Sequence, residues 1–366
     1  MNALRRLVIA TTLSICLAVP AGSHAAAPRA FYGVIAANDP GQTELSRMST
    51  GGVGTLRINL VWGAVQSGPA AVFDWTHYDE LIGNAARAGI RVLPTVYSSP
   101  PWSAVHEYYP PSRRTRREYG NFVRAAAARY GRRGTFWTEH PDILRLPIRD
   151  WQLWNEPNLQ GFWLPKLSPK SYVRLLRVFR HAVRSGDRSG RVLLAGLFPS
   201  PTAHGSVIGI PLRRYLSGIY RQKRAKALFD GVDIHPYVRT PHRVLAWVKR
   251  TRGIMLRFND PKTPIWLGEI GWPTGGDPSP LTVSPERQAA YLWRTFNLLA
   301  AKRVRFRIAG AVWYSWRDVP GHAWFNHTGL FTQEFEPKPS WNSFASLTGS
   351  SAIAPASSGA LPIPPP

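Results

Sequence analysis

Residues 151–158 read Trp-Gln-Leu-Trp-Asn-Glu-Pro-Asn, and residues 264–273 read Pro-Ile-Trp-Leu-Gly-Glu-Ile-Gly-Trp-Pro. Each stretch is a short apolar run of the kind that forms a buried strand, and each places a glutamate where the strand is predicted to end. Pro157 stops the first run because proline cannot donate a hydrogen bond to a sheet ladder. Gly268 and Gly271 flank the glutamate of the second run and allow close approach of the backbone. Both stretches are therefore predicted to be strands of one buried sheet.

The same pattern recurs along the chain, where short apolar runs alternate with helical stretches. Strands are predicted at residues 31–36, 55–60, 91–96, 151–155, 192–195, 232–235, 265–269 and 311–314. Helices, recognised by apolar residues at helical spacing, are predicted at residues 79–88, 116–130, 170–185, 212–226, 242–258 and 285–301. Ser168 and Ser284 stand directly before Pro169 and Pro285, so each serine is expected to cap a helix.

Eight strand–helix units in a chain of 366 residues predict the fold class. Such a series is what a closed α/β barrel requires, so residues 28–347 are predicted to form a single-domain (β/α)8 TIM barrel. An open doubly wound sheet is disfavoured, because it usually needs fewer units and because no glycine-rich phosphate-binding fingerprint follows the first strand. Residues 348–366 are rich in Pro, Ser, Ala and Gly and are predicted to be a flexible tail.

Residues 1–27 have the features of an export signal peptide. Arg5 and Arg6 precede an apolar run at 7–19, and small residues follow at 21–27. An uncleaved anchor is the alternative, but the run is short for a bilayer core. Cys16 stands in a lipobox-like context in which the bulky Ile15 occupies a position that favours a small residue. Cleavage would leave a mature protein without cysteine, secreted or associated with the cell envelope, with no stable membrane insertion.

The chain is strongly basic, with 46 Lys and Arg against 21 Asp and Glu and a formal charge of +25. Such a charge attracts polyanions. Basic clusters at 113–117, 221–226 and 302–307 are expected on or beside outer helices. The favoured interpretation is a basic exterior that associates with an anionic cell-envelope polymer, and an acidic substrate is the alternative. No nucleic-acid partner is expected, because no recognised nucleic-acid motif accompanies the charge.

Glu156 and Glu269 are the candidate catalytic residues. The active site of such a barrel lies at the carboxyl ends of its strands, where both glutamates are predicted to lie. Glycosidic cleavage demands two carboxylates, one to protonate the departing oxygen and one to stabilise or capture the sugar centre. Arg57, near the end of the second predicted strand, is the candidate cation beside one of them. No metal and no cofactor are expected, because the histidines show no ligand-like spacing.

These residues resemble the motifs of clan A, the retaining (β/α)8 glycoside hydrolases. Residues 154–158 are similar to the acid/base motif of that clan, and residues 268–272 are similar to its nucleophile strand. The resemblance extends over about residues 31–341, and it is greatest to glycoside hydrolase family 39, with family 5 next. It implies that Glu156 is the acid/base, that Glu269 is the nucleophile and that cleavage retains the anomeric configuration.

The resemblance also implies roles for further residues. Asn155 would hold the 2-hydroxyl of the sugar, His235 and Tyr237 would orient the site, and Trp313 would stack under the reacting sugar. Other tryptophans at predicted strand ends are expected to bind sugar faces, with loop packing as the alternative; they are Trp102, Trp163, Trp272 and Trp316.

Long aromatic loops favour a groove for an oligo- or polysaccharide. Trp324, Phe162 and Phe325 belong to these loops. The favoured function is a retaining glycoside hydrolase acting on β-linked glycosides or polysaccharide. A transglycosylase of the same clan and a non-catalytic cell-envelope polysaccharide-binding barrel remain as alternatives.

Overall fold

The computed structural model describes residues 26–36, 38–199 and 208–350. Most of the predicted export signal, Cys16 included, and all but the first three residues of the predicted tail lie outside these ranges. The strands are β1 Tyr32–Ile35, β2 Thr55–Val61, β3 Arg91–Tyr97, β4 Asp150–Leu153, β5 Arg191–Leu193, β6 Val232–Ile234, β7 Ile265–Ile270 and β8 Ile308–Tyr314.

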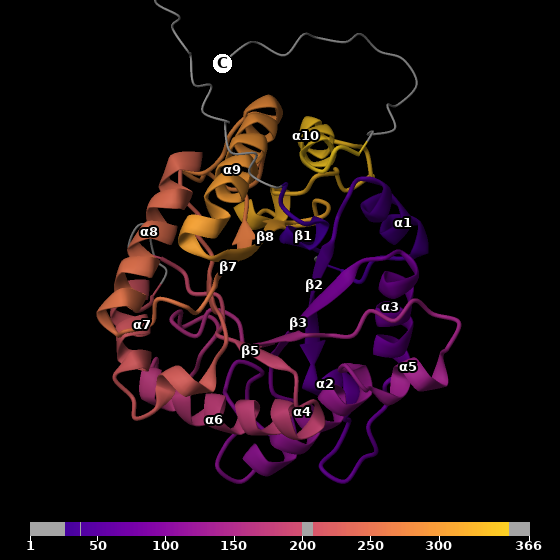
Figure 1. Cartoon of the computed structure of the whole chain (residues 1–366), viewed down its shortest axis with the longest axis vertical. Coiled ribbons are helices and arrows are strands. Elements are labelled where there is room, and N and C mark those ends of the chain that lie inside the picture. Colours follow the sequence, from indigo (N-terminus) through magenta and orange to yellow (C-terminus); the bar gives the residue numbers. More distant parts are fainter. Residues whose placement is uncertain (1–25, 37, 200–207, 351–366) are drawn as a thin grey trace, which may run out of the picture.

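The strands form a closed parallel barrel, which confirms the predicted fold class. Hydrogen-bonded neighbours run in the order β5-β4-β3-β2-β1-β8-β7-β6, and every pair in this order is parallel. The seam between β5 and β6 is joined by the parallel bridges Leu193–Gly231 and Leu197–Ile234. Figure 1 shows the helices arranged as a ring outside the strands. All strands therefore end on one face of the molecule.

The helices largely match the predictions. Their bounds are α1 Gln42–Thr50, α2 Trp62–Val65, α3 Thr76–Arg87, α4 Arg116–Tyr130, α5 Thr135–Glu139, α6 Pro169–Gly186, α7 Leu212–Tyr220, α8 Pro241–Arg257, α9 Pro285–Phe306 and α10 Pro339–Leu347. Short 3-10 turns lie at Arg29–Phe31, Ala225–Leu228 and Trp324–His327. The Ser168 side chain accepts from Ser171 N, and the Ser284 side chain accepts from Arg287 N, each at 3.2 Å, so both predicted caps are confirmed.

The helix predictions need two corrections. α7 ends at Tyr220 rather than at residue 226, because the chain leaves the helix and Arg224 adopts a left-handed φ of 56°. The predicted helices also omit α1, α2, α5 and α10, which are short; α1, for example, buries only Leu45 and Met48. No helix among the described residues is long and apolar enough to cross a membrane.

The hydrophobic core lies between the sheet and the helices. Leu153 and Ile265 from the strands belong to one buried cluster with Phe122 of α4, Leu176 of α6 and Phe296 of α9. This layer supplies the main burial energy of the fold.

The part of the barrel interior next to the active site is polar by contrast, whereas Leu93, Leu193 and Trp266 form a separate apolar cluster. Arg57, Thr95, Gln152 and Asp233 come from four different strands, are all nearly inaccessible to solvent and bond to one another. The fold thus places its polar network directly beneath the carboxyl ends of the strands.

Candidate active site

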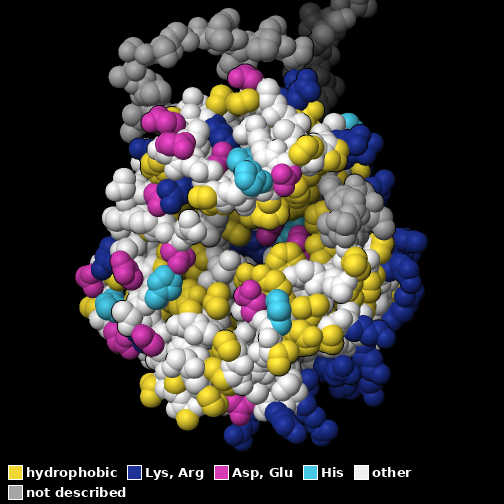
Figure 2. Space-filling view, turned by 180° about the vertical axis from the view of Figure 1, so that it is seen from behind, with side chains coloured by type: hydrophobic (Ala, Val, Ile, Leu, Met, Phe, Trp, Pro, Cys, Tyr) yellow, Lys and Arg dark blue, Asp and Glu magenta, His cyan; other side chains and the backbone are white. Residues whose placement is uncertain are grey.

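A cavity of about 580 Å³ opens at the carboxyl ends of the strands. Figure 2 shows it as a hollow near the centre of the face, with acidic side chains inside. The structure brings five of the predicted site residues to its lining, namely Arg57, Asn155, Glu156, Tyr237 and Glu269.

Glu156 is held in place by an irregular backbone immediately after β4. Trp154 and Glu156 both have a positive φ, 67° and 36°, which residues other than glycine rarely adopt. Asn158 fixes the following turn, because its Nδ2 donates to the carbonyls of Phe198 at 2.8 Å and Ile210 at 2.9 Å. Such locally strained backbone is typical of positions where a side chain must point in one direction.

Glu269 lies on β7 with both carboxylate oxygens occupied. Arg57 Nη1 donates to Oε1 at 2.7 Å, and the Tyr237 hydroxyl donates to Oε2 at 2.7 Å. The Arg57 side chain is 1% exposed and that of Glu269 10%, so the pair is almost removed from solvent. These two contacts fix the orientation of the carboxylate.

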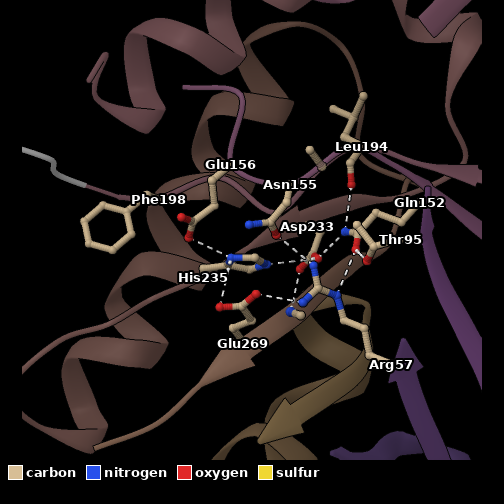
Figure 3. Close-up of polar contacts among 12 residues, drawn as sticks. Arg57, Thr95, Gln152, Asn155, Glu156, Leu194, Phe198, Asp233, His235 and Glu269 are labelled. Carbon is tan, nitrogen blue, oxygen red and sulfur yellow. Dashed lines mark hydrogen bonds and ion pairs between the residues drawn. The ribbon is translucent and has the colours of Figure 1, made fainter. Parts of the chain in front are cut away.

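Arg57 is itself held by two further acceptors (Figure 3). Its Nε donates to Gln152 Oε1 at 3.0 Å, and its Nη2 donates to Asn155 Oδ1 at 2.9 Å. Gln152 Oε1 also accepts from Thr95 Oγ1 at 2.8 Å. A guanidinium offers its donors in a rigid fork, so these contacts determine its position closely.

His235 lies between the two glutamates, as Figure 3 shows. Its Nδ1 is 2.8 Å from Glu156 Oε1 and 3.6 Å from Glu269 Oε2, and its Nε2 is 3.6 Å from Asp233 Oδ2. Burial acts to lower the pKa of His235, but the nearby carboxylates of Glu269, Asp233 and Glu156 outweigh burial and raise it to about 10. The surrounding carboxylates therefore favour the charged form of His235.

Burial also changes the pKa of Glu156. Removal from solvent raises the pKa of the Glu156 carboxyl, and the charge of Glu269 acts in the same direction. The hydrogen bond and charge of His235 oppose this rise. The two glutamates thus differ in environment, since Glu269 contacts a guanidinium and a phenol whereas Glu156 contacts an imidazole.

Two glycines make room for this network. A Cβ on Gly196 would lie 1.8 Å from His235 Nε2, and a Cβ on Gly268 would lie 2.1 Å from Asp233 Oδ2. Gly268 also donates its backbone N–H to Asp233 Oδ1 at 2.6 Å. The sequence alone shows no reason for a glycine at 196, because the ring that it accommodates comes from another strand.

A metal ion does not suit this cluster. Glu156, His235 and Glu269 each place one possible ligand atom within 4.8 Å of the others. However, both oxygens of Glu269 already accept hydrogen bonds, from Arg57 and from the Tyr237 hydroxyl. Arg57, at 2.7 Å from Glu269, already supplies the positive charge that a cation would bring.

The structure does not place the five predicted tryptophans in the cavity lining, and four of them are buried too deeply to stack on sugar. Trp163, Trp272, Trp313 and Trp316 are at most 1% exposed, and Trp102 is half-buried against Trp62, with ring centroids 4.7 Å apart. Their indole N–H groups bond elsewhere: Trp313 to the carbonyl of Thr328, Trp272 to that of Val238, Trp102 to that of Gln66 and Trp316 to the Glu44 carboxylate. These side chains anchor loops.

Side-chain alternation explains the error at Trp313. Neighbouring residues of a strand point to opposite faces of the sheet. Trp313 therefore points outward to Phe296 of α9, whereas Tyr314 points inward and lines the cavity. The same rule could have found Asn59, which lies two residues after Arg57 and lines the cavity beside it.

Other aromatic residues form the walls. Tyr97 at the end of β3 lines the cavity, and burial raises its pKa to about 12. Trp324 lies over Tyr237 in a T-shaped contact at 5.2 Å, and Phe162 and Phe325 complete the aromatic wall. These last three residues come from the loops that were predicted to flank the cleft.

Solved structures of glycoside hydrolases share this fold. A family 39 glycoside hydrolase from the gut symbiont Bacteroides cellulosilyticus is 21% identical, with a TM-score of 0.63, and the match covers 87% of this chain and 63% of that one. GH5_18 from Streptomyces cattleya, in complex with GlcNAc, is 15% identical, with a TM-score of 0.63 and coverage of 87% and 79%. A monomeric β-xylosidase from Caulobacter crescentus is 19% identical, with a TM-score of 0.59 and coverage of 87% and 68%.

This chain has the fold of these glycoside hydrolases. It spans less than two thirds of the length of the family 39 protein. No protein-family model and no curated protein matches its sequence. The comparisons therefore establish the architecture, and the chemistry has to be argued from the site.

The placement of Trp313 leads to a stability prediction. Trp313→Ala is expected to lower the free energy of unfolding by about 3 to 5 kcal/mol, because it opens a cavity between β8 and α9. Urea denaturation followed by circular dichroism measures the change. Trp324→Ala removes an equally large ring from the partly exposed cavity wall and is expected to cost less than about 2 kcal/mol. Equal losses in the two variants would contradict the outward, buried position of Trp313.

Proposed function

We propose that this protein is a retaining glycoside hydrolase that cleaves β-linked glycosides in oligo- or polysaccharides. The observation that supports this most directly is the spacing of the two glutamates, which place carboxylate oxygens within 4.8 Å of each other across the cavity floor. Retaining enzymes separate their carboxylates by about 5 to 5.5 Å, whereas inverting enzymes need about 6.5 to 9.5 Å to admit a water. The spacing supports double displacement.

In the first step a carboxylate oxygen of Glu269 attacks the anomeric carbon and forms a covalent glycosyl ester. The bond from that carbon to the leaving oxygen breaks, and Glu156 donates its proton to this oxygen. Burial favours this role, because it raises the pKa of Glu156 and keeps the proton in place until it is needed.

In the second step a water attacks the anomeric carbon and gives a proton to Glu156, and Glu269 departs as a carboxylate. The charge of Glu269 is absent while it carries the sugar. Since that charge raises the pKa of Glu156, its loss makes Glu156 more acidic at the moment when it must act as a base. His235 keeps Glu156 in position through the 2.8 Å contact.

Asn155 is suited to a hydroxyl of the reacting sugar. Its Oδ1 accepts from Arg57, which orients the amide so that the NH₂ group is left for the cavity. Asn59, Tyr97 and Tyr314 add further polar groups to the lining. Trp324 and Phe162 offer apolar faces of the kind on which sugar rings stack.

The lining favours an uncharged sugar. Arg57 is the one lysine or arginine among the described lining residues, and its donors are taken by Glu269, Gln152 and Asn155. Residues 200–207, beyond the described ranges, contain no lysine or arginine in the sequence. A carboxylate on the substrate would have to share the arginine that Glu269 already holds, so the described lining favours a neutral sugar over an acidic one.

We also propose that residues 1–27 direct export and are removed, so that the mature protein acts outside the cell or at the cell envelope. The support is the charged start, the apolar run and the small residues that follow it. Amino-terminal sequencing of the exported protein tests this: a start near residue 28 agrees with it, and a start at Met1 contradicts it.

Substitution of the two glutamates tests the reaction. A panel of neutral 4-nitrophenyl β-glycosides and polysaccharides first identifies a substrate. Glu269→Gln is expected to lower kcat by about 10⁴-fold or more, because no covalent ester can form. Glu156→Gln is expected to lose about 10² to 10⁴-fold on substrates with poor leaving groups and much less on activated aryl glycosides.

The exposed Glu334→Gln makes the same chemical change outside the site and is expected to keep full activity. Proton NMR of the first product gives its configuration. Inverted product, or turnover of Glu156→Gln equal to that of the wild type on every substrate, would contradict the assignment. Elongated or rearranged chains would identify a transglycosylase with the same two residues.

The pH profile gives an independent test. The basic limb of kcat/KM reports the loss of the Glu156 proton and is expected above the ordinary pKa of a glutamate, because burial raises it. His235→Gln keeps a hydrogen-bond donor but removes a charge that lowers the pKa of Glu156. The basic limb of this variant should therefore move to higher pH in stopped assays. A limb that stays in place or moves to lower pH would show that His235 does not act on Glu156 in this way.

A further inference from the structure

A second hollow lies on the outer wall of the barrel and shares no lining residue with the active-site cavity. It has a volume of about 680 Å³ and follows α7, with the end of α8 beside it. Four arginines line it: Arg213, Arg214, Arg221 and Arg257. We name it the arginine groove. Pro169, Ile210 and Phe258 supply its apolar surface.

The four arginines of the groove have no acidic partner among the described residues. All four are exposed, and none forms an ion pair or a side-chain hydrogen bond within the described ranges. Other arginines in the chain behave differently, since Arg129, Arg180 and Arg191 each pair with an aspartate. The groove thus collects guanidinium groups that the fold leaves without counter-charge.

Charge is segregated around this groove. Residues 166–260 contain 20 Lys and Arg but only 4 Asp and Glu, so this quarter of the chain carries 20 − 4 = +16 of the formal +25. Figure 2 shows lysines and arginines gathered along the margin formed by α6 to α8, at the right, away from the central hollow.

The four aspartates of this segment offer little neutralisation. Asp233 and Asp260 are buried, Asp230 pairs with Arg180, and Asp187 accepts from the backbone of Arg132 and Ser189. A solvated basic face usually intersperses acids among its bases, which this segment does not do. The surface over α6 to α8 therefore has a one-signed field.

Two of the groove arginines lie at the amino-terminal end of a helix, where a positive charge is unfavourable. Arg213 and Arg214 occupy the first turn of α7, which contains no acidic residue. The amino-terminal end of a helix carries partial positive charge, so a cation there is unfavourable. Structure alone gives no reason for two arginines at this end. A bound anion would turn the same arrangement into a favourable one.

We propose that the arginine groove binds a flexible single-chain polymer that carries oxyanions, phosphodiester or carboxylate, along its backbone. Guanidinium forks match both groups. Residues 213 and 221 are eight positions apart, which is about 12 Å along the helix, so the groove can contact successive repeat units of an extended chain. The site requires no cleavage of this polymer and serves to hold the protein on an anionic matrix.

The position of the four arginines around a hollow between helices, rather than on a flat face, favours a flexible polyanion. A lipid bilayer presents a flat surface and a DNA duplex a rigid cylinder, and neither enters a hollow between helices as a flexible single chain does. The groove also differs from the catalytic cavity, whose lining favours a neutral sugar. Binding at α7 is thus separate from hydrolysis and does not depend on the proposed reaction.

Two variants with the same loss of charge test the groove. The first replaces Arg213, Arg214, Arg221 and Arg257 with Gln. The control replaces four other exposed arginines on and around α4 with Gln: Arg113, Arg114, Arg124 and Arg133. Calorimetry of the full mature chain with poly(glycerol phosphate) and with polygalacturonate gives Kd at about 50 mM and about 300 mM salt.

The groove variant is expected to weaken binding of at least one polymer by about tenfold or more, and the control variant by less than about threefold. Wild-type affinity should fall with added salt. The polymer that responds identifies the oxyanion. Equal losses in both variants, no binding of either polymer, or tighter binding to anionic vesicles or duplex DNA than to both polymers would overturn the proposal.

Circular dichroism of both variants verifies their folding. Hydrolysis of a neutral aryl glycoside should be the same in both, because none of the eight arginines lines the catalytic cavity. Polymer binding without any glycosidase activity would refute the proposed reaction and leave the groove standing. Glycosidase activity without groove-dependent binding would refute the groove proposal and leave the proposed reaction standing.

Discussion

The buried contact between Arg57 and Glu269 is the constraint on which the rest of the site depends. A guanidinium removed from water is tolerated only when acceptors surround it, and Gln152 and Asn155 supply those acceptors. Gln152 in turn contacts Thr95 and Asp233, which bring in two more strands. One charge pair thus dictates what several inward positions of the barrel must be. The carboxylate at its end gains a fixed direction from the whole network.

The barrel interior and the layer between strands and helices have different roles in this arrangement. The interior beneath the active site is committed to polar groups, and the small apolar cluster of Leu93, Leu193 and Trp266 is separate from the main core, so most of the apolar burial comes from the layer between strands and helices. The large indoles of Trp272 and Trp313 lie in that outer layer, where they pack against each other, Trp313 against Phe296 and Trp272 against Tyr291. In the sequence these large aromatic residues resemble ligand-binding residues. In the structure they pack between the strands and the helices and support the strands that carry the polar network.

The sequence could predict what depends on local order along the chain. Strand ends, helix caps and the positions of Glu156 and Glu269 follow from apolar runs, prolines and motifs, and these place both glutamates on one face. Which side of the sheet a residue faces needs the strand register, so Trp313 was assigned to the wrong face. Gly196 and His235 come together only in the closed barrel, and no local pattern reports that contact.

Charge is arranged oppositely in the catalytic cavity and in the arginine groove. The catalytic cavity uses its one arginine internally, so its electrostatics act on its own carboxylates and on a proton. The arginine groove leaves four guanidinium groups toward solvent. The two hollows share no lining residue, and the glutamates form their ion pairs with Arg57 and His235 rather than with the groove arginines. A basic exterior can therefore coexist with an active site that depends on finely balanced carboxylates, because the protein keeps the two apart.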